Sequence, residues 1–117
     1  MNKIVLLGRL VKDPEVRYTT TEKAVCQFTL AVNRPMKQDE ADFIPVVIWG
    51  KSAELIGNTV SKGQRLLVEG RLQIRNYEKD GQKHWITEVI ANNFEYIEKK
   101  TNGQVPPTVP YDEEVPF

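Results

Sequence analysis

Two alternating runs joined by a short segment with helical spacing decide the fold of this chain. The first run is DFIPVVIWGK, residues 42–51, and the second is VEGRLQIRNY, residues 68–77, followed by the turn residues 79–81, Lys-Asp-Gly. Alternate side chains of a strand point to opposite faces of a sheet, so each run has an aliphatic face and a second face. The second face carries aromatic and cationic side chains, namely Phe43, Trp49, Arg71, Arg75 and Tyr77.

The segment between the two runs, residues 52–60, predicts a helix. Ser52 is placed to cap its N-terminus, and Glu54 is favourable in the first turn. Gly57 costs this short helix about 1 kcal/mol relative to alanine, so we expect tertiary packing to stabilise it. The side chains expected on its buried side are Ala53, Ile56 and Val60.

Three further apolar runs predict strands. They are residues 3–11, in which Gly8 marks a bulge or a close backbone approach, and residues 24–33 and 84–97. In the second of these runs the even-numbered residues form one buried face, which includes the lone cysteine, Cys26, as a packed free thiol. In the last run apolar residues occupy both parities.

The connections between these strands are equally informative. Asp80-Gly81 is a strong indication of a two-residue hairpin, while residues 36–41 read as a polar hairpin loop. Residues 15–21 form either a connecting ribbon or a short strand. Pro45 has no N–H to donate, so its strand should lie at or near a sheet edge there.

This order of elements predicts the fold class. The chain is all-β, with five strands and one short helix between the third and the fourth, which is the arrangement of an oligonucleotide/oligosaccharide-binding (OB) barrel. That fold binds single strands on its open face. A small β-sandwich is the alternative, but it would not require a helix at that position.

Length and charge suggest one domain with a tail. At 117 residues the chain can bury a core without disulfides. We expect a folded domain over residues 1–99, a disordered linker over 100–111 that contains three prolines, and an acidic tip over 112–117. The net charge is zero, but residues 1–111 hold sixteen cations and thirteen anions. An acidic tip therefore follows a mildly basic body.

The sequence also limits the cellular setting and the chemistry. No hydrophobic run approaches the ~18 residues of a membrane span, and the N-terminus is not typical of a signal peptide, so we expect a cytoplasmic, nucleoid-associated protein without a membrane partner. One histidine, His84, and one cysteine leave no metal-ligand spacing, and no phosphate-binding glycine loop occurs. We expect no enzyme activity, no catalytic residues, no metal and no cofactor.

The mixed aromatic and cationic face predicts binding of single-stranded nucleic acid. Each base stacked on an aromatic ring contributes ~1–3 kcal/mol whatever its identity, and cations bind the phosphates in a salt-sensitive way. The pattern leaves Phe43 undecided between burial and exposure, favours exposure for Trp49 and Tyr77, and favours a structural role for Trp85. The candidates for backbone contacts are Lys3, Arg9, Arg34, Lys51, Lys62, Arg71 and Arg75.

Several short runs, in their order and spacing, resemble the bacterial single-stranded DNA-binding protein family. They are NKIVLLGRL (2–10), DPEVRY (13–18), TLAVNR (29–34), ADF (41–43), WGKSAE (49–54), KG (62–63), EGRL (69–72), RNY (75–77) and TEV (87–89). The resemblance implies an OB-fold homotetramer that wraps single-stranded DNA. It also implies that Phe43, Trp49 and Tyr77 are the base-stacking residues and that Lys51 and Lys62 contact the backbone.

The tip carries the resemblance further. Its residues Asp112, Glu113, Glu114, Val115, Pro116 and Phe117 resemble the acidic tip through which family members recruit DNA replication, repair and recombination proteins. Carboxylates suit a basic pocket, and Phe117 with its α-carboxylate suits an aromatic anchor. From the residues alone, a solubilising acidic tail explains the tip equally well.

Three hypotheses of function follow. The leading one is a sequence-independent single-stranded DNA-binding homotetramer that protects strands and recruits partners. The alternatives are an OB-fold replisome or primosome adaptor with weak DNA affinity, and an RNA-binding OB protein of the cold-shock type. Deletion of residues 115–117 and competition between poly(dT) and poly(U) separate them.

Overall fold

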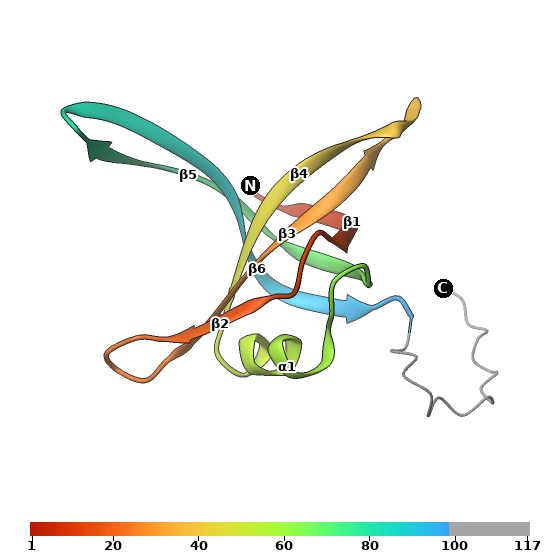
Figure 1. Cartoon of the computed structure of the whole chain (residues 1–117), viewed down its shortest axis with the longest axis horizontal. Helices are drawn as coiled ribbons and strands as arrows, with labels where there is room; N and C mark the ends of the chain where they lie inside the picture. The colour runs from red at the N-terminus through yellow and green to blue at the C-terminus, as the bar shows by residue number, and fades with distance from the viewer. Residues whose placement is uncertain (99–117) are drawn as a thin grey trace.

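Six strands and one helix form within residues 1–98, the part of the chain that the computed structural model describes (Figure 1). In chain order they are β1 (Ile4–Leu10), β2 (Glu15–Tyr18), β3 (Ala24–Arg34), β4 (Lys37–Trp49), α1 (Lys51–Thr59), β5 (Arg65–Lys79) and β6 (Gln82–Tyr96). The expected linker and acidic tip lie outside the described residues.

Five of the strands close into a barrel. The sheet order is β1-β5-β6-β4-β3-β2, and β1 also pairs with β3, so β1, β5, β6, β4 and β3 form a complete ring. The helix lies between β4 and β5, as in the predicted OB barrel, which is therefore confirmed. The short strand β2 pairs only with β3 within the described chain, and it is the segment that the sequence left open between ribbon and strand.

The core consists of one face of each barrel strand together with one side of the helix. The even-numbered residues from Ala24 to Leu30 in β3, and Val46 and Ile48 in β4, are buried as predicted, and so are the three predicted helix residues. Full burial of one valine, leucine or isoleucine side chain contributes about 1.5–3 kcal/mol to the stability of the fold. The largest fully buried side chains are Leu30, Ile48, Ile56, Leu66, Val46, Val68, Val89 and Cys26.

A β-bulge in β6 moves the core side of this strand from the odd-numbered residues before the bulge to Phe94 after it. Gly70 of β5 pairs with Ala91, whereas the preceding residue Glu69 pairs with Asn93. The extra residue reverses the alternation. Ala91 before the bulge is buried and Phe94 after it packs against the core, although the two differ in parity.

Two long hairpins extend beyond the barrel (Figure 1). The β5–β6 hairpin turns at Asp80 and Gly81, which both have positive φ, 56° and 79°, as a two-residue hairpin with a type I′ turn requires. The β3–β4 hairpin turns at Pro35 and Met36, between Arg34 and Lys37. The predicted polar loop over residues 36–41 is therefore wrong, because most of that polar segment continues β4 as one strand of an exposed ribbon.

The helix differs from its prediction at the N-terminus. It begins at Lys51, its N-cap is Gly50 with φ 80°, and no side chain caps it. The Gly50 carbonyl accepts the backbone N–H groups of Ala53 and Glu54. Ser52 thus already lies in the first turn, and the prediction that it caps the helix is wrong.

Two backbone positions behave as their residue types require. A Cβ on Gly8 would lie 2.7 Å from the carbonyl oxygen of Ala31, so the close backbone approach is confirmed. Pro45 pairs with Thr29 of β3, and the pairing of β4 with β6 begins only at the next residue, Val46. The missing N–H thus falls at an edge position, as predicted.

The inner face of the β5–β6 hairpin departs from the expectation. The pattern predicted that the aliphatic face of β5 would supply the core throughout, but Leu72 and Ile74 are exposed. They lie where the hairpin leaves the barrel, and the described chain covers them only in part, with Leu72 39% and Ile74 60% exposed. Trp85, for which the pattern favoured a structural role, lies on the same hairpin and is 64% exposed, so it does not pack into the core of the described chain.

Candidate nucleic-acid interface

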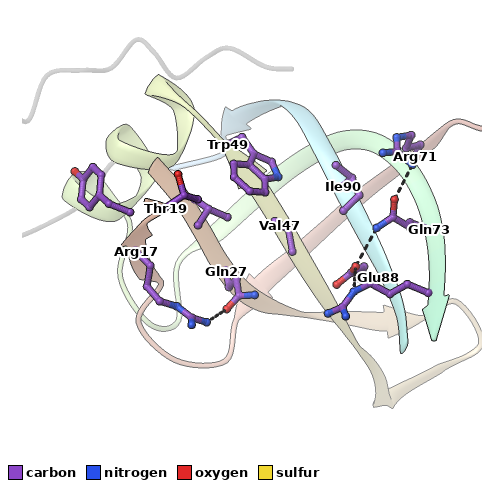
Figure 2. Close-up of a pocket in the computed structure, with 12 residues that line it drawn as sticks. Arg17, Thr19, Gln27, Val47, Trp49, Arg71, Gln73, Glu88 and Ile90 are labelled. Atoms are coloured by element: carbon purple, nitrogen blue, oxygen red, sulfur yellow. Dashed lines mark hydrogen bonds and ion pairs between the residues drawn. The ribbon is translucent and has the colours of Figure 1, made fainter. Parts of the chain in front are cut away.

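A groove of about 570 Å³ crosses the outer face of β2, β3, β4, β6 and β5 (Figure 2). Strand pairing aligns one row of side chains across it, because Gln27 pairs with Val47, Val47 with Ile90, and Ile90 with Arg71. The centre of this row is apolar and both ends are polar. The groove therefore offers a flat apolar floor between hydrogen-bonding and cationic walls.

The groove continues along the same face. A second hollow of about 290 Å³ shares Gln27, Val47, Arg75 and Glu88 with the first. These shared residues join the two hollows into one surface.

Trp49 is the predicted stacking residue that lies within the groove. It is the last residue of β4 and pairs with Val25 of β3, so β3 and β4 fix its position. Trp49 is 43% exposed, and the Lys23 ammonium lies 5.7 Å from the centroid of its ring. A cation at this distance interacts favourably with the π face of the indole.

The wall formed by β2 was not predicted. Arg17 donates a hydrogen bond of 2.5 Å to Oε1 of Gln27 (Figure 2). The Tyr18 hydroxyl bonds to the Glu54 carboxylate of α1 at 3.1 Å, and this hydrogen bond raises the pKa of Tyr18. The helix thus helps to hold β2 against the end of the groove.

The opposite wall carries a chain of hydrogen bonds along β5. Arg71 donates to Gln73 at 3.1 Å, and Gln73 donates to Oε2 of Glu88 at 3.2 Å (Figure 2). Arg75 donates its Nε–H to the same oxygen at 2.8 Å. The two predicted arginines therefore lie on one wall, and both connect to a carboxylate on β6.

The other two predicted stacking residues lie on the projecting hairpins. Phe43 of β4 is 66% exposed and Tyr77 of β5 is 41% exposed. Phe43 shares the parity of Trp49, and Tyr77 shares that of Arg71, so each extends the outer face that carries the groove. The Tyr77 ring stacks on His84 with centroids 5.3 Å apart, which covers part of its surface.

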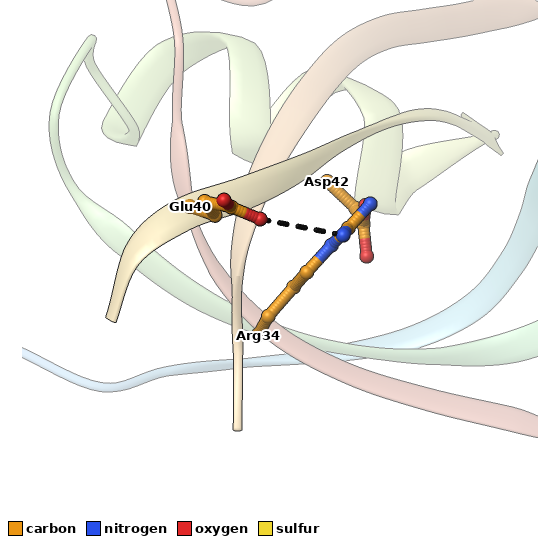
Figure 3. A network of polar contacts seen from close by, with 3 residues as sticks. All are labelled: Arg34, Glu40 and Asp42. Atoms are coloured by element: carbon orange, nitrogen blue, oxygen red, sulfur yellow. Dashed lines mark hydrogen bonds and ion pairs between the residues drawn. The ribbon is translucent and has the colours of Figure 1, made fainter. Parts of the chain in front are cut away.

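Arg34 is already neutralised within its own hairpin. Its guanidinium approaches Asp42 at 2.9 Å and Glu40 at 3.4 Å (Figure 3). All three side chains are about half exposed, and such surface pairs contribute about 0–1 kcal/mol. A phosphate would therefore compete with two carboxylates for this arginine.

The remaining predicted cations are spread around the molecule. Lys3 forms an ion pair with Glu69, which holds the pKa of that carboxyl below its usual range, and Arg9 donates to the Gly63 carbonyl at 2.7 Å. Lys51 is the first residue of α1, and Lys62 follows the helix, where its backbone N–H bonds to Asp13. None of these four lines the groove.

The polar groove residues that sequence reasoning missed include Arg17, Gln27, Gln73 and Glu88. Gln73 shares the parity of Arg71 and Arg75 on β5, and Gln27 lies on the odd-numbered, polar face of β3, so strict use of alternation would have indicated both. Arg17 required knowledge that β2 pairs with β3. Glu88 is buried, and nothing in the sequence distinguished it from an exposed strand carboxylate.

Within residues 1–98, no group of three or more histidine, cysteine or carboxylate side chains could hold a metal ion. The same part of the chain has no helix long and apolar enough to cross a membrane. Its cysteine, Cys26, is a buried free thiol. The predicted tip residues 112–117 lie outside the described residues.

The closed barrel, with an aromatic and cationic groove on its outer face, places this protein in the class of OB-fold proteins. Comparison with known proteins identifies the family within that class. The model of the single-strand binding protein family matches residues 1–97. The chain belongs to this family, as its sequence predicted.

Individual relatives agree with this assignment. Single-stranded DNA-binding protein 3 of Listeria innocua serovar 6a is 51% identical, over 88% of this chain and 68% of its own length. Single-stranded DNA-binding protein 1 of Streptococcus pyogenes serotype M18 is 52% identical, over 87% and 82%. Single-stranded DNA-binding protein 2 of Streptococcus agalactiae serotype III is 42% identical, over 99% of this chain and 98% of its own length.

Proposed function

We propose that this protein binds single-stranded DNA without sequence preference and protects it during replication, recombination and repair. The observation that carries the proposal is the groove around Trp49, which combines an exposed indole and an apolar floor with arginines on both walls. Aromatic faces accept any base, and guanidinium groups bind phosphates. The names of the relatives support single-stranded DNA as the ligand.

The strand would follow the outer face between the two hairpins. Trp49 in the groove, Phe43 on the β3–β4 hairpin and Tyr77 on the β5–β6 hairpin would stack bases. Arg71 and Arg75 on the wall would contact the backbone, with Lys51 and Lys62 near the ends of α1. Lys3, Arg9 and Arg34 have intramolecular partners and also lie outside the groove, so we assign them a smaller part.

The protein would act as a homotetramer. Residues 4–7 of β1 pair with β5 on one side, and the pairing of β1 with β3 covers only Arg9 and Leu10. An unpaired strand edge invites pairing with another chain. Val5 and Leu7 are exposed on the outer face of this strand, which supports a second copy as the neighbour.

The acidic tip, residues 112–117, would recruit replication, repair and recombination proteins, and residues 100–111 would tether it to the domain of residues 1–99. Three carboxylates followed by Val-Pro-Phe suit a partner surface with a basic rim and an apolar pocket. The DNA ligand would place the protein on exposed strands of the bacterial nucleoid.

Titration with poly(dT), combined with measurement of the mass in solution, tests the proposal. We expect quenching of tryptophan fluorescence that weakens as salt rises, together with the mass of a tetramer. A parallel titration with poly(U) should show weaker binding. The absence of both quenching and a mobility shift at low salt would refute DNA binding.

Removal of residues 115–117 tests the role of the tip. We expect the shortened protein to bind poly(dT) as the intact chain does, and to lose the capture of replication and repair proteins. An intact chain that captures such partners but has negligible affinity for DNA would instead support a replisome or primosome adaptor.

A further inference from the structure

Glu88 is a buried carboxylate in a groove that we propose to hold a polyanion. It is the one charged residue that is buried within residues 1–98, with 5% of its surface exposed. It belongs to both hollows of the groove. A negative charge at this point disfavours the binding of phosphate. The carboxylate must therefore have a role other than direct contact with DNA.

The hydrogen bonds of Glu88 point to its neighbours on β5. Its Oε2 accepts both the Arg75 Nε–H at 2.8 Å and the Gln73 amide at 3.2 Å. The Arg75 side chain is 48% exposed, whereas that of Glu88 is 6% exposed. The guanidinium is thus available to a strand in the groove, but its charge is balanced from beneath by a carboxylate that the fold holds in place.

Arg71 provides an internal comparison. It lies four residues from Arg75 on the same strand and the same face, and both line the groove. Arg71 bonds to the neutral amide of Gln73 at 3.1 Å and has no carboxylate partner among the described residues. The two arginines therefore present different net charges to a strand at the same wall.

We propose that Glu88 acts as an internal competitor for DNA phosphate, so that Arg75 contributes less to binding than Arg71 and the affinity for single-stranded DNA is held below what the groove cations would give. The inference rests on the proposed binding of single-stranded DNA. Its basis is electrostatic: a phosphate that approaches Arg75 is attracted by the guanidinium and repelled by the carboxylate beside it. Such a contact releases little counterion, because the cation is already neutralised.

The first test removes the charge of Glu88. Glu88→Gln keeps the shape and hydrogen-bonding capacity of the side chain but removes its charge. We expect poly(dT) affinity to rise about fourfold at 0.15 M salt, and the slope of log K against log salt to steepen by about 0.7, the value for one added phosphate contact on a single strand.

Glu95→Gln is the matched control for this test. Glu95 lies on the same strand, is exposed, and is absent from the groove lining. It changes the net charge by the same amount, so we expect little change in either quantity. Equal effects of the two substitutions, or weaker binding by Glu88→Gln, would overturn the inference.

A double-mutant cycle tests the route through Arg75. In the wild-type background, Arg71→Gln should make the salt slope shallower by about 0.7, and Arg75→Gln should change it much less. In the Glu88→Gln background, Arg75→Gln should remove the slope that Glu88→Gln added. Equal losses from Arg71→Gln and Arg75→Gln in the wild-type background would contradict the proposal.

Thermal melting of each variant checks that the fold is intact. The single variant Arg75→Gln leaves the buried Glu88 carboxylate without its cation, and this variant could therefore unfold. The double variant Glu88→Gln/Arg75→Gln lacks both charges and avoids that problem. If Arg75→Gln unfolds, the comparison of the double variant with Glu88→Gln still tests the proposal. Wild-type protein that does not bind poly(dT) would refute the proposed function and this inference with it. Wild-type protein that binds, with Glu88→Gln equal to Glu95→Gln, would refute this inference alone.

Discussion

Trp49 and Trp85 provide a comparison between two exposed indoles on opposite faces. Trp49 lies in the groove, whereas Trp85 pairs with Asn76 on the face of the β5–β6 hairpin that Leu72 and Ile74 share. We expect Trp49→Ala to weaken poly(dT) binding by ~1–3 kcal/mol, the contribution of one base stack, and Trp85→Ala to leave the intrinsic affinity per chain nearly unchanged. Fluorescence anisotropy with a labelled oligo(dT) measures both.

The solution mass of each tryptophan variant serves as its control, because a change in assembly would alter apparent affinity without any loss of stacking. A loss of affinity in Trp85→Ala that equals the loss in Trp49→Ala, at unchanged mass, would contradict the assignment of the groove as the binding face.

Cys26 makes stability fall with pH above 9. Burial raises the pKa of its thiol from 9.0 to about 11, so above pH 9 the unfolded chain releases a proton that the folded chain keeps. The free energy of unfolding then falls by up to about 1.4 kcal/mol per pH unit until pH approaches 11. Cys26→Ala removes this dependence.

Urea unfolding at pH 8.0 and at pH 10.5 measures the effect of the thiol. We expect the stability advantage of wild type over Cys26→Ala to shrink by about 2 kcal/mol between these two values. The titrations of tyrosine and lysine cancel in the difference, since both proteins share them. An advantage that does not change with pH would show that the thiol ionises equally in both states.

At the scale of elements, Gly57 explains how α1 packs against β2. A Cβ at this position would collide with Cγ2 of Val16. Helix propensity alone predicts that Gly57→Ala stabilises α1 by about 1 kcal/mol. We expect the opposite, a loss of about 1–3 kcal/mol from overpacking, with a matching fall in the urea midpoint.

Val16→Ala is the background that isolates this contact. With the Val16 methyl groups removed, Gly57→Ala should no longer clash and should become neutral or stabilising. Gly57→Ala that stabilises the wild-type protein would show that β2 moves away from the helix at little cost.

Alternation and turn chemistry were sufficient to predict most elements. The inward residues of β3, the Asp80-Gly81 turn and the helix side of Ile56 follow from local residue types. The failures arose where tertiary structure decides. Gly50, and not Ser52, is the N-cap residue because the chain turns directly after β4. Leu72 is exposed because its hairpin extends beyond the barrel.

The candidate site shows the same division. Parity placed Trp49, Arg71 and Arg75 on one face, and the structure brings these three into the groove. Parity could not show that Glu88 neutralises Arg75 or that Asp42 neutralises Arg34, because both depend on strand pairing. Composition also could not separate the cations that line the groove from those that bond to the protein's own main chain elsewhere, such as Arg9, which donates to the Gly63 carbonyl.

At the scale of the whole molecule, the outer face of β1 provides the test of assembly. Leu7 and Leu55 are almost equally exposed, 46% and 47%, but Leu7 lies on β1 and Leu55 on α1. We expect Leu7→Glu to dissociate the proposed tetramer, because a charge replaces an apolar contact, and Leu55→Glu to leave it intact. Light scattering after size-exclusion chromatography gives the masses, and a Leu7→Glu tetramer would argue for another interface.

The two short seams of the barrel bear on the order in which it folds. The β3–β4 and β5–β6 hairpins join residues close in sequence, whereas ring closure depends on three parallel pairs between β4 and β6 and two pairs between β1 and β3. Distant contacts are slower to form because of loop-closure entropy. We therefore expect Gly81→Ala, in a hairpin turn, to slow folding, and Val89→Ala, in a seam, mainly to speed unfolding, which stopped-flow kinetics of the two variants would resolve.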